Sequence, residues 1–587
     1  MFLAPDRAPS LLAFKPPESV GRRSVQKAGK QAGHASFPGW QRRGSYATMQ
    51  AGRRGECRLV FSHPGTRSMP PHARNSLPHV ITWIRGYVQG ETMNRGVLLF
   101  LLLLGTAAVA APWETLPPDH WAYPEIGWLQ TQGYLHGLNP SVQPWTRGEI
   151  TRALQAGPRP PEGAALRRYQ RLEREFPGIT QQRDGWQFFA GGRLTYGGQG
   201  AFGRDPRGTG SAALQYGAGN PFLGFYSAQR GDLDLARDPY YQGKKWNDLA
   251  GFTEAAYLRF TAARWQATLG RDHVAWGPGP DRLLLNDAPR GLDQVSFQVR
   301  WEWGRFHALM GQVSDVTDSA GNRSNRFLSG HRLEVSPWSW LRVGLSETLL
   351  FSSLRLGSLN PFLPYYGELV NENSEGNGLI SLDANAFFAP GWQAYGQLLL
   401  DDIQLESETS LDNEPAEWGW LAGLRWAGMD GLLGAGLTYQ GVTHRTYNAT
   451  DSTYRYTSYG LPLGSALGND GDQWQVDVAL WPAGGLRLEA FGRYRRQGEG
   501  RVQAVFDTSY LNYPVELGYD EPFPTGVVEK TTTLGGGFDY LVNPWIQLQG
   551  TLNHAWIRNF GNRDGVKEEG WTGRAVVTVR LDRIITK

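Results

Sequence analysis

Cysteine is almost absent from this chain of 587 residues, and its one cysteine, Cys57, lies near the start. A disulfide-held scaffold is therefore excluded, so a core, a membrane or hydrogen-bond ladders must stabilise the fold. Long apolar runs are also missing, since no stretch after residue 111 approaches the ~20 residues that a membrane-spanning helix needs. No cysteine follows the apolar run at residues 97–104, which excludes a lipoprotein anchor.

That apolar run belongs to residues 93–111, MNRGVLLFLLLLGTAAVAA, which are typical of a secretory signal peptide. A positively charged start precedes it, and small residues in an A-x-A pattern follow it. An export signal is normally read at the N-terminus, so we expect Met93 to be the true start. Residues 1–92 are then a disordered upstream extension from a start codon placed too early. The alternative is a basic disordered arm that binds nucleic acid or acidic lipid.

An excess of positive charge is also missing from the exported part. The whole chain carries 58 basic and 55 acidic residues, a net charge of +3. Without residues 1–92 it carries 44 basic and 51 acidic residues, a net charge of −7. The basicity comes from the upstream segment, so nucleic acid is not an expected partner.

What fills residues 185–587 is a series of short alternating runs rich in Trp, Tyr, Leu and Gly. In residues 474–480, Trp474, Val476, Val478 and Leu480 alternate with polar or small residues. Strand side chains point to opposite faces in turn, so each run has an apolar and a polar side. A soluble sandwich also alternates, but its strands are typically ~5–6 residues long. Runs of ~9–13 residues instead suit tilted strands that cross an apolar band of ~25 Å.

The connections between these runs alternate strictly between short and long. Short turns are predicted near 261–263, 303, 337–338, 389–391, 428–430, 482–485 and 542–544. Long polar connections are predicted near 235–250, 273–293, 315–330, 352–377, 403–415, 443–471, 498–530 and 557–569. This pattern is typical of a transmembrane antiparallel β-barrel with short periplasmic turns. We predict about 18 strands, with 16 as the alternative. Trp residues near strand ends, including Trp303, Trp338, Trp418, Trp481 and Trp545, are predicted to form interfacial girdles.

Residues 112–180 are predicted to form a small periplasmic α-helical region. Thr146 is a good N-cap with Glu149 three residues later, which is the capping-box pattern. His120-Trp121-Ala122, Ile126, Leu129 and Thr146-Arg147-Gly148-Glu149 resemble an S-layer homology (SLH) module, although that family usually has Ala at the position of Gly148. The resemblance implies contact with a peptidoglycan-linked polymer through Trp121, Arg147 and Glu149. The alternative is that Arg147 and Glu149 only cap and solvate a helix.

Motifs in the barrel half resemble the Wzi-type capsule assembly family. They are GRDHVAWGPG at residues 270–279, LLLNDAP at 283–289, LNPF at 359–362 and YGQLLLDD at 395–402. The resemblance implies an 18-stranded outer-membrane barrel that binds capsular polysaccharide at the cell surface. The SLH-like segment also heads a class of porins, so diffusion of small solutes through the barrel is the alternative function.

The loop after residue 270 offers candidate sugar contacts: His273, Trp276, Arg282, Asn286 and Asp287. Aromatic faces pack on apolar sugar faces, while Arg, Asn and Asp hydrogen-bond to hydroxyls. The alternative is a constrained Gly- and Pro-rich loop that plugs the barrel. Acidic residues near 368–375 and at Asp401-Asp402 lack a recognised calcium-loop spacing, so neither a metal nor another cofactor is predicted. Hydrolase motifs such as G-x-S-x-G are absent, and the chain is not expected to be an enzyme.

Overall fold

The computed structural model describes residues 111–177, 185–201, 206–287, 290–317, 321, 323–372, 375–403 and 409–586. The predicted upstream extension, and the signal peptide up to residue 110, lie outside these residues and stay predictions. No helix within the described ranges is both long enough and apolar enough to span a bilayer.

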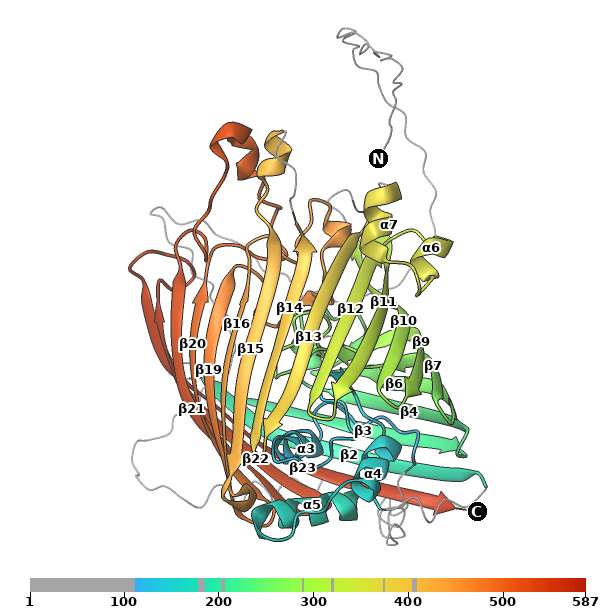
Figure 1. Cartoon of the computed structure of the whole chain (residues 1–587). Helices are drawn as coiled ribbons and strands as arrows, with labels where there is room; N and C mark the ends of the chain where they lie inside the picture. Colours follow the sequence, from blue (N-terminus) through green and yellow to red (C-terminus); the bar gives the residue numbers. More distant parts are fainter. Residues whose placement is uncertain are drawn as a thin grey trace, which may run out of the picture. The chain divides into compact units, whose positions relative to one another are not determined.

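Eighteen long antiparallel strands form a closed barrel, in which the last strand, β23, pairs with the first, β2 (Figure 1). This confirms the predicted fold and the count of 18. A two-residue strand, β5 (Lys245–Trp246), pairs only with β6. The strands are β2 Gln187–Ala201, β3 Arg207–Gly219, β4 Leu223–Asp232, β6 Leu249–Ala262, β7 Trp265–Asp272, β9 Leu292–Trp301, β10 Gly304–Thr317, β11 Arg323–Trp338, β12 Leu341–Phe351, β13 Asn377–Ala389, β14 Trp392–Asp402, β15 Glu417–Gly428, β16 Leu433–Val442, β19 Gly471–Ala483, β20 Leu486–Gln497, β21 Glu529–Asn543, β22 Ile546–Arg558 and β23 Lys567–Thr586.

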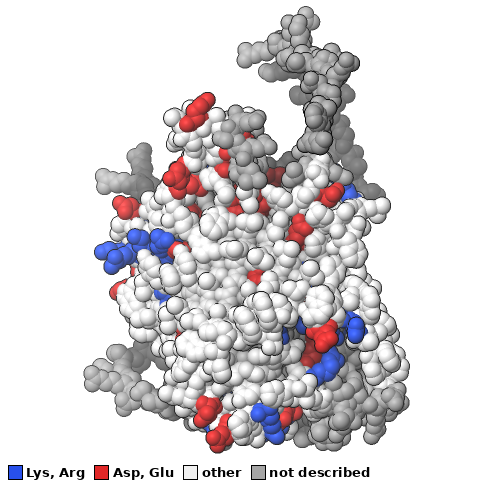
Figure 2. All heavy atoms as spheres, viewed as in Figure 1, with Lys and Arg blue, Asp and Glu red and all other residues white. Residues whose placement is uncertain are grey.

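Side chains along each strand alternate between an apolar outer face and a polar inner face of the barrel wall. On β14, Leu398 faces outward and is 49% exposed, whereas Gln393 and Gln397 face the lumen and are buried. Trp474 and Val476 of β19 are likewise exposed on the outside. Figure 2 shows a wall over β12–β16 with few charges, while charged residues gather toward its two ends. Closure matters because lipid offers no partner for backbone groups, and only a closed sheet has no edge.

The predicted short turns are confirmed, and each joins a pair of neighbouring strands at one end of the barrel. One prediction about the long connections was wrong: β11 begins at Arg323, so the connection after β10 is shorter than residues 315–330. Two short helices, α6 (Leu356–Leu359) and α7 (Tyr365–Glu372), lie in the β12–β13 connection. By the rule that short turns face the periplasm, we call the end with long connections the outer end.

The helical region consists of α3 (Ala122–Thr131), α4 (Arg147–Ala156) and α5 (Gly163–Glu175) at the periplasmic end of the barrel (Figure 1). The predicted capping box is present, because the Thr146 hydroxyl accepts from the Glu149 N–H and the Glu149 carboxylate accepts from the Thr146 N–H. Apolar residues of all three helices, including Ile126, Ile150 and Leu172, share one buried core.

Side-chain contacts tie this helical region to the barrel wall. Trp481 donates from Nε1 to Glu125 of α3 over 2.9 Å, and the Arg168 guanidinium lies 4.0 Å from the Trp481 ring centroid. The prediction that Trp481 belongs to an interfacial girdle was therefore wrong. Trp481 is only 2% exposed because its position in β19 turns it inward, whereas Trp303, Trp338, Trp418 and Trp545 are 41–61% exposed.

Two long outer connections fold back into the lumen. Residues 273–287 place Trp276 and Leu283 against wall residues such as Leu328 and Leu399, and residues 443–470 add Tyr447 to the same core. The N-terminal region reaches this core from the other side, since β1 (Val142–Gln143) pairs with β8 (Ala275–Trp276). The middle of the barrel is thus filled by a plug, which we define as residues 273–287, 290–291 and 443–470.

Candidate functional site

The five predicted sugar contacts lie in the plug and not on the outer surface. Trp276 is 1% exposed and packs in the lumen core. Arg282 is buried and donates from Nε to the Gly277 carbonyl over 3.0 Å and from Nη2 to Gln143 over 2.7 Å. Their assignment to polysaccharide stays a prediction, and their burial favours the alternative of a constrained plugging loop.

The structure does not bring these five side chains to one site. His273 and Trp276 line a small internal cavity of about 80 Å³. Arg282 and Asp287 line a different one of about 260 Å³, next to α3. Asn286 donates from Nδ2 to Asp281 over 2.7 Å instead of facing either space.

Asp281 is a plug residue that sequence reasoning missed. Its carboxylate accepts from Asn286 and the Ala466 N–H at 2.7 and 2.8 Å, and from Gln440 and Ser465 at 2.6 and 2.7 Å. It thereby joins one inward connection to the other and both to strand β16. Four donors on one carboxylate hold the two connections together inside the lumen.

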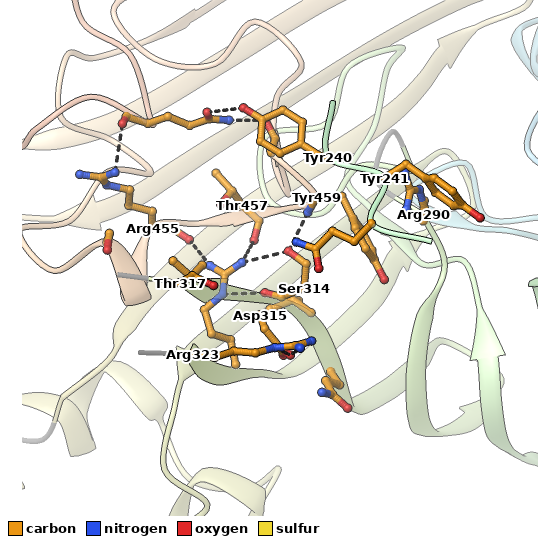
Figure 3. Close-up of a pocket in the computed structure, with 18 of the residues that line it drawn as sticks. Tyr240, Tyr241, Arg290, Ser314, Asp315, Thr317, Arg323, Arg455, Thr457 and Tyr459 are labelled. Carbon is orange, nitrogen blue, oxygen red and sulfur yellow. Dashed lines mark hydrogen bonds and ion pairs between the residues drawn. The ribbon is translucent and has the colours of Figure 1, made fainter. Parts of the chain in front are cut away.

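A larger cavity of about 660 Å³ opens at the outer end (Figure 3). Its walls come from the β4–β6 connection, the outer ends of β10 and β11, and the connections after β16 and β20. Figure 3 shows Tyr241, Arg290 and Tyr459 together on one side and Arg455 on the other. We call this space the outer cavity. Its described lining includes Tyr240, Tyr241, Arg290, Asp293, Gln312, Ser314, Asp315, Thr317, Arg323, Arg326, Arg455, Thr457, Tyr459 and Gln503.

Arg326 builds the floor of the outer cavity. It is 1% exposed and donates to the carbonyls of Ser314, Arg455 and Thr457 over 2.8, 2.9 and 2.8 Å. These bonds fasten the segment around Thr457 to the ends of β10 and β11. The Ser314 hydroxyl accepts a further hydrogen bond from Arg326, so neutral oxygens hold this buried guanidinium and no carboxylate among the described residues is in direct contact with it.

A layer of two tyrosines and one arginine forms a side wall. The Arg290 guanidinium lies 4.3 Å from the Tyr459 ring centroid and 5.6 Å from that of Tyr241, and it pairs with Asp238 over 2.7 Å. Cation–π contact and the ion pair together fix the orientation of the guanidinium. Tyr240 adds a second aromatic edge and is 43% exposed.

Cations outnumber anions in the outer cavity. Arg290, Arg323, Arg326 and Arg455 line it, against Asp293 and Asp315. Arg455 donates to the Gln503 carbonyl and to Asn448, and it has no carboxylate in contact within the described residues. Exposed aromatic faces beside guanidinium, hydroxyl and amide groups are the chemistry that holds a sugar with an acidic substituent.

The residues predicted to touch a wall polymer are occupied by contacts within the chain. Arg147 pairs through Nε with Glu114 over 3.0 Å and through Nη1 with Glu175 over 3.1 Å, and it is 7% exposed. Glu149 caps α4 and accepts from Arg300 of β9 over 3.0 Å. Trp121 is 4% exposed. These contacts favour the capping and packing alternative, and the predicted wall contact stays untested.

His120 lies buried in the helical region, and its protonation state follows from its contacts. Its Nδ1 accepts from the Ala122 N–H over 3.2 Å, and its Nε2 lies 3.5 Å from Glu175. Burial lowers the pKa of His120 to about 4, although Glu175 opposes the shift. Burial raises the pKa of Glu175, but hydrogen bonding from His120 and the charge of Arg147 outweigh it and leave that pKa at about 2. At neutral pH the imidazole is neutral and donates toward a carboxylate.

Within the described ranges, one group of three potential metal ligands lies on the outer connections: His444, Asp507 and Glu521. Arg445 donates to Glu521 over 2.7 Å and to Asp507 over 3.1 Å. Its guanidinium therefore already supplies the positive charge that a cation would bring. The acidic residues considered for calcium are dispersed: Asp401 accepts from the Tyr447 N–H, and Asp402 accepts from Tyr366.

Fold and site together define an outer-membrane-type β-barrel with a filled lumen and an outer cavity. A family model described as capsule assembly protein Wzi matches residues 200–569. The match covers more than half of the chain, so the chain belongs to the capsule assembly protein Wzi family.

One solved structure supports the fold, and two others are less similar. The structure of Escherichia coli Wzi, described as an outer membrane protein involved in group 1 capsule assembly and a carbohydrate-binding β-barrel, matches with a TM-score of 0.54 and 17% identity, covering 80% of this chain and 99% of that one. Pseudomonas aeruginosa OccD3 and OprD match with a TM-score of 0.41 each and identities of 11% and 13%, covering 69% and 68% of this chain and 93% and 95% of theirs. No curated protein matches the sequence.

Proposed function

We propose that the chain sits in the outer membrane and binds a surface or capsular polysaccharide in the outer cavity, without catalysis. The observation that carries this proposal is the pairing of a filled lumen with an open cavity of about 660 Å³ at the outer end. Family membership and the description of E. coli Wzi as a carbohydrate-binding β-barrel support it.

The mechanism follows from the layout of the cavity. A pyranose ring stacks on Tyr459, its hydroxyls hydrogen-bond to groups such as Ser314 and Gln503, and its carboxylate or other acidic substituent pairs with Arg455. Each contact is weak, and retention of a long polymer comes from many repeats meeting many barrels at the cell surface.

Diffusion of small solutes is the second candidate function. The plug weighs against it, because Trp276 and Tyr447 occupy the lumen between the outer cavity and α3. Contact with a peptidoglycan-linked polymer through the SLH-like region is a separate proposal, supported only by the sequence resemblance around Trp121 and Arg147.

Co-sedimentation of purified protein in liposomes with capsular polysaccharide from the same cells tests the proposal. Tyr459→Ala removes the aromatic ring that lies against Arg290 and on which the sugar stacks. Loss of ~1 kcal/mol of stacking energy should weaken polysaccharide binding about fivefold. Tyr513→Ala is the matched control, because Tyr513 is 47% exposed on the connection after β20 and does not line the cavity. Equal binding by both variants would contradict the proposed site.

A further inference from the structure

One face of helix α5 carries a row of arginines at the periplasmic rim of the barrel. Arg167, Arg171 and Arg174 are spaced i, i+4 and i+7, which places them on one side of the helix. None has a carboxylate partner within the part of the chain that the structure describes. The other side is different, since Arg168 is buried against Glu125 and Trp481. The row is notable because the exported part of the chain carries net negative charge.

These arginines line a groove of about 360 Å³ between α5 and two periplasmic turns. The turns join β19 to β20 at Gly484-Gly485 and β21 to β22 at Leu541–Pro544. Figure 1 shows α5 running across the lower end of the barrel, where these turns lie. A groove shared by a basic helix face and the end of the barrel wall opens where lipid headgroups meet the protein.

Trp121 adds an unsatisfied donor to the groove. It is 4% exposed and lines the groove, and its indole Nε1–H has no acceptor among the described residues. The Arg171 guanidinium lies 5.7 Å from the Trp121 ring centroid. A buried indole N–H normally finds an acceptor, so its lack of one points to a bound group that supplies an oxygen.

The rim of the groove fixes its height in the membrane. Val542 and Trp545, on the β21–β22 turn, are 45% and 61% exposed. An exposed Trp at a strand end is typical of the boundary between acyl chains and headgroups. Acyl chains therefore contact Val542 and Trp545 while a headgroup lies level with the arginine row.

We propose that this groove binds the phosphate headgroup of an anionic phospholipid of the periplasmic leaflet. Arg167, Arg171 and Arg174 supply the positive charge, and Trp121 donates a hydrogen bond to a phosphate oxygen. Guanidinium groups suit this task because they pair with phosphate through two parallel hydrogen bonds. The bound lipid fixes the helical region against the membrane surface, independently of any polysaccharide on the outer side.

Native mass spectrometry of the full-length protein in detergent, titrated with phosphatidylglycerol, tests the proposal. The wild type should retain one phosphatidylglycerol in preference to phosphatidylcholine. The triple variant Arg167→Gln, Arg171→Gln, Arg174→Gln should lose at least tenfold in affinity, since each arginine near a lipid surface contributes about fivefold. Arg237→Gln, Lys244→Gln, Arg563→Gln makes the same charge change on the outer connections and should bind as the wild type does.

Three outcomes would overturn the proposal. Equal phosphatidylglycerol retention by the triple variant would place the lipid elsewhere. Displacement by millimolar inorganic phosphate would show a general phosphate site instead of a lipid site. If the wild type co-sediments with peptidoglycan and the triple variant does not, the groove binds the cell wall and not a lipid. Should the triple variant fail to fold, Arg167→Gln and Arg174→Gln alone change exposed side chains and carry the same test.

Discussion

Replacement of Trp276 by alanine is the sharpest perturbation of the plug. The Trp276 side chain is 1% exposed and packs among the leucines of the lumen core. A buried aromatic side chain removes 150–250 Å² from water, so its loss costs ~4–6 kcal/mol at 25 cal/mol per Å². Mutational series for core Trp and Phe give a similar ~3–5 kcal/mol. Trp276 meets the wall only through side-chain packing, for example near Leu328, whereas its backbone pairs with β1, so its loss leaves the hydrogen-bond ladder of the wall intact and loosens the plug first.

The assay is planar-bilayer conductance with thermal unfolding measured in parallel. Wild-type protein should give little or no current, whereas Trp276→Ala should give intermittent channel openings. The temperature at which the barrel wall unfolds should be nearly the same in both. Trp246→Ala is the matched control, since Trp246 is 56% exposed on the β4–β6 connection. A large steady current from the wild type, or no difference between the two variants, would refute the plug as the barrier in the lumen.

Further predictions concern the helical region and the plug. The pKa of His120 is about 4 in the folded protein, against an ordinary 6.5. The neutral, buried imidazole therefore contributes its full stabilisation of the helical region above pH 6.5, and up to ~3 kcal/mol of it is lost as the pH falls toward 4. The hydrogen-exchange protection factors of residues 112–177, corrected for the pH dependence of the intrinsic exchange rate, should therefore fall between pH 6.5 and 4 in the wild type but not in His120→Gln, and an identical profile in both would disprove this. Thr146→Ala removes the cap of α4 and should cost ~1 kcal/mol, seen as faster exchange confined to residues 147–150. Asp281→Ala leaves four donors without their acceptor, which costs ~1–3 kcal/mol of stability for each donor that stays buried. Residues 443–470 should then become open to proteolysis, and resistance equal to that of the wild type would show that Asp281 does not hold the two connections together.

Alternation and turn chemistry predicted the barrel well, because each strand's faces are decided locally. Trp474, Val476 and Val478 face lipid as the pattern indicates. The same parity shows why Trp481 failed as a girdle residue: it lies seven positions from Trp474, which is an odd number, so it must face inward. Continuing the alternation to the last residues of β19 would have placed the Trp481 side chain inside the barrel, next to α3.

The outer cavity was beyond sequence reasoning for a different reason, and plugging of the barrel was considered only as an alternative for the loop after residue 270. Arg326 of β11 lies far in the chain from Arg455 and Tyr459, and it meets them only because the connection after β16 folds back over β10 and β11. The signal for the plug was present in Leu283-Leu284-Leu285, an apolar run within a predicted outside connection. Such a run needs a core, and inside a barrel the lumen supplies it.

A structure of the protein in lipid nanodiscs with an oligosaccharide released from the capsule of the same cells tests the central claim most directly. We expect sugar density in the outer cavity, stacked on Tyr459 and paired with Arg455, above an undisturbed plug. Sugar density in the lumen with the plug displaced, or an outer cavity empty at saturating oligosaccharide, would contradict it.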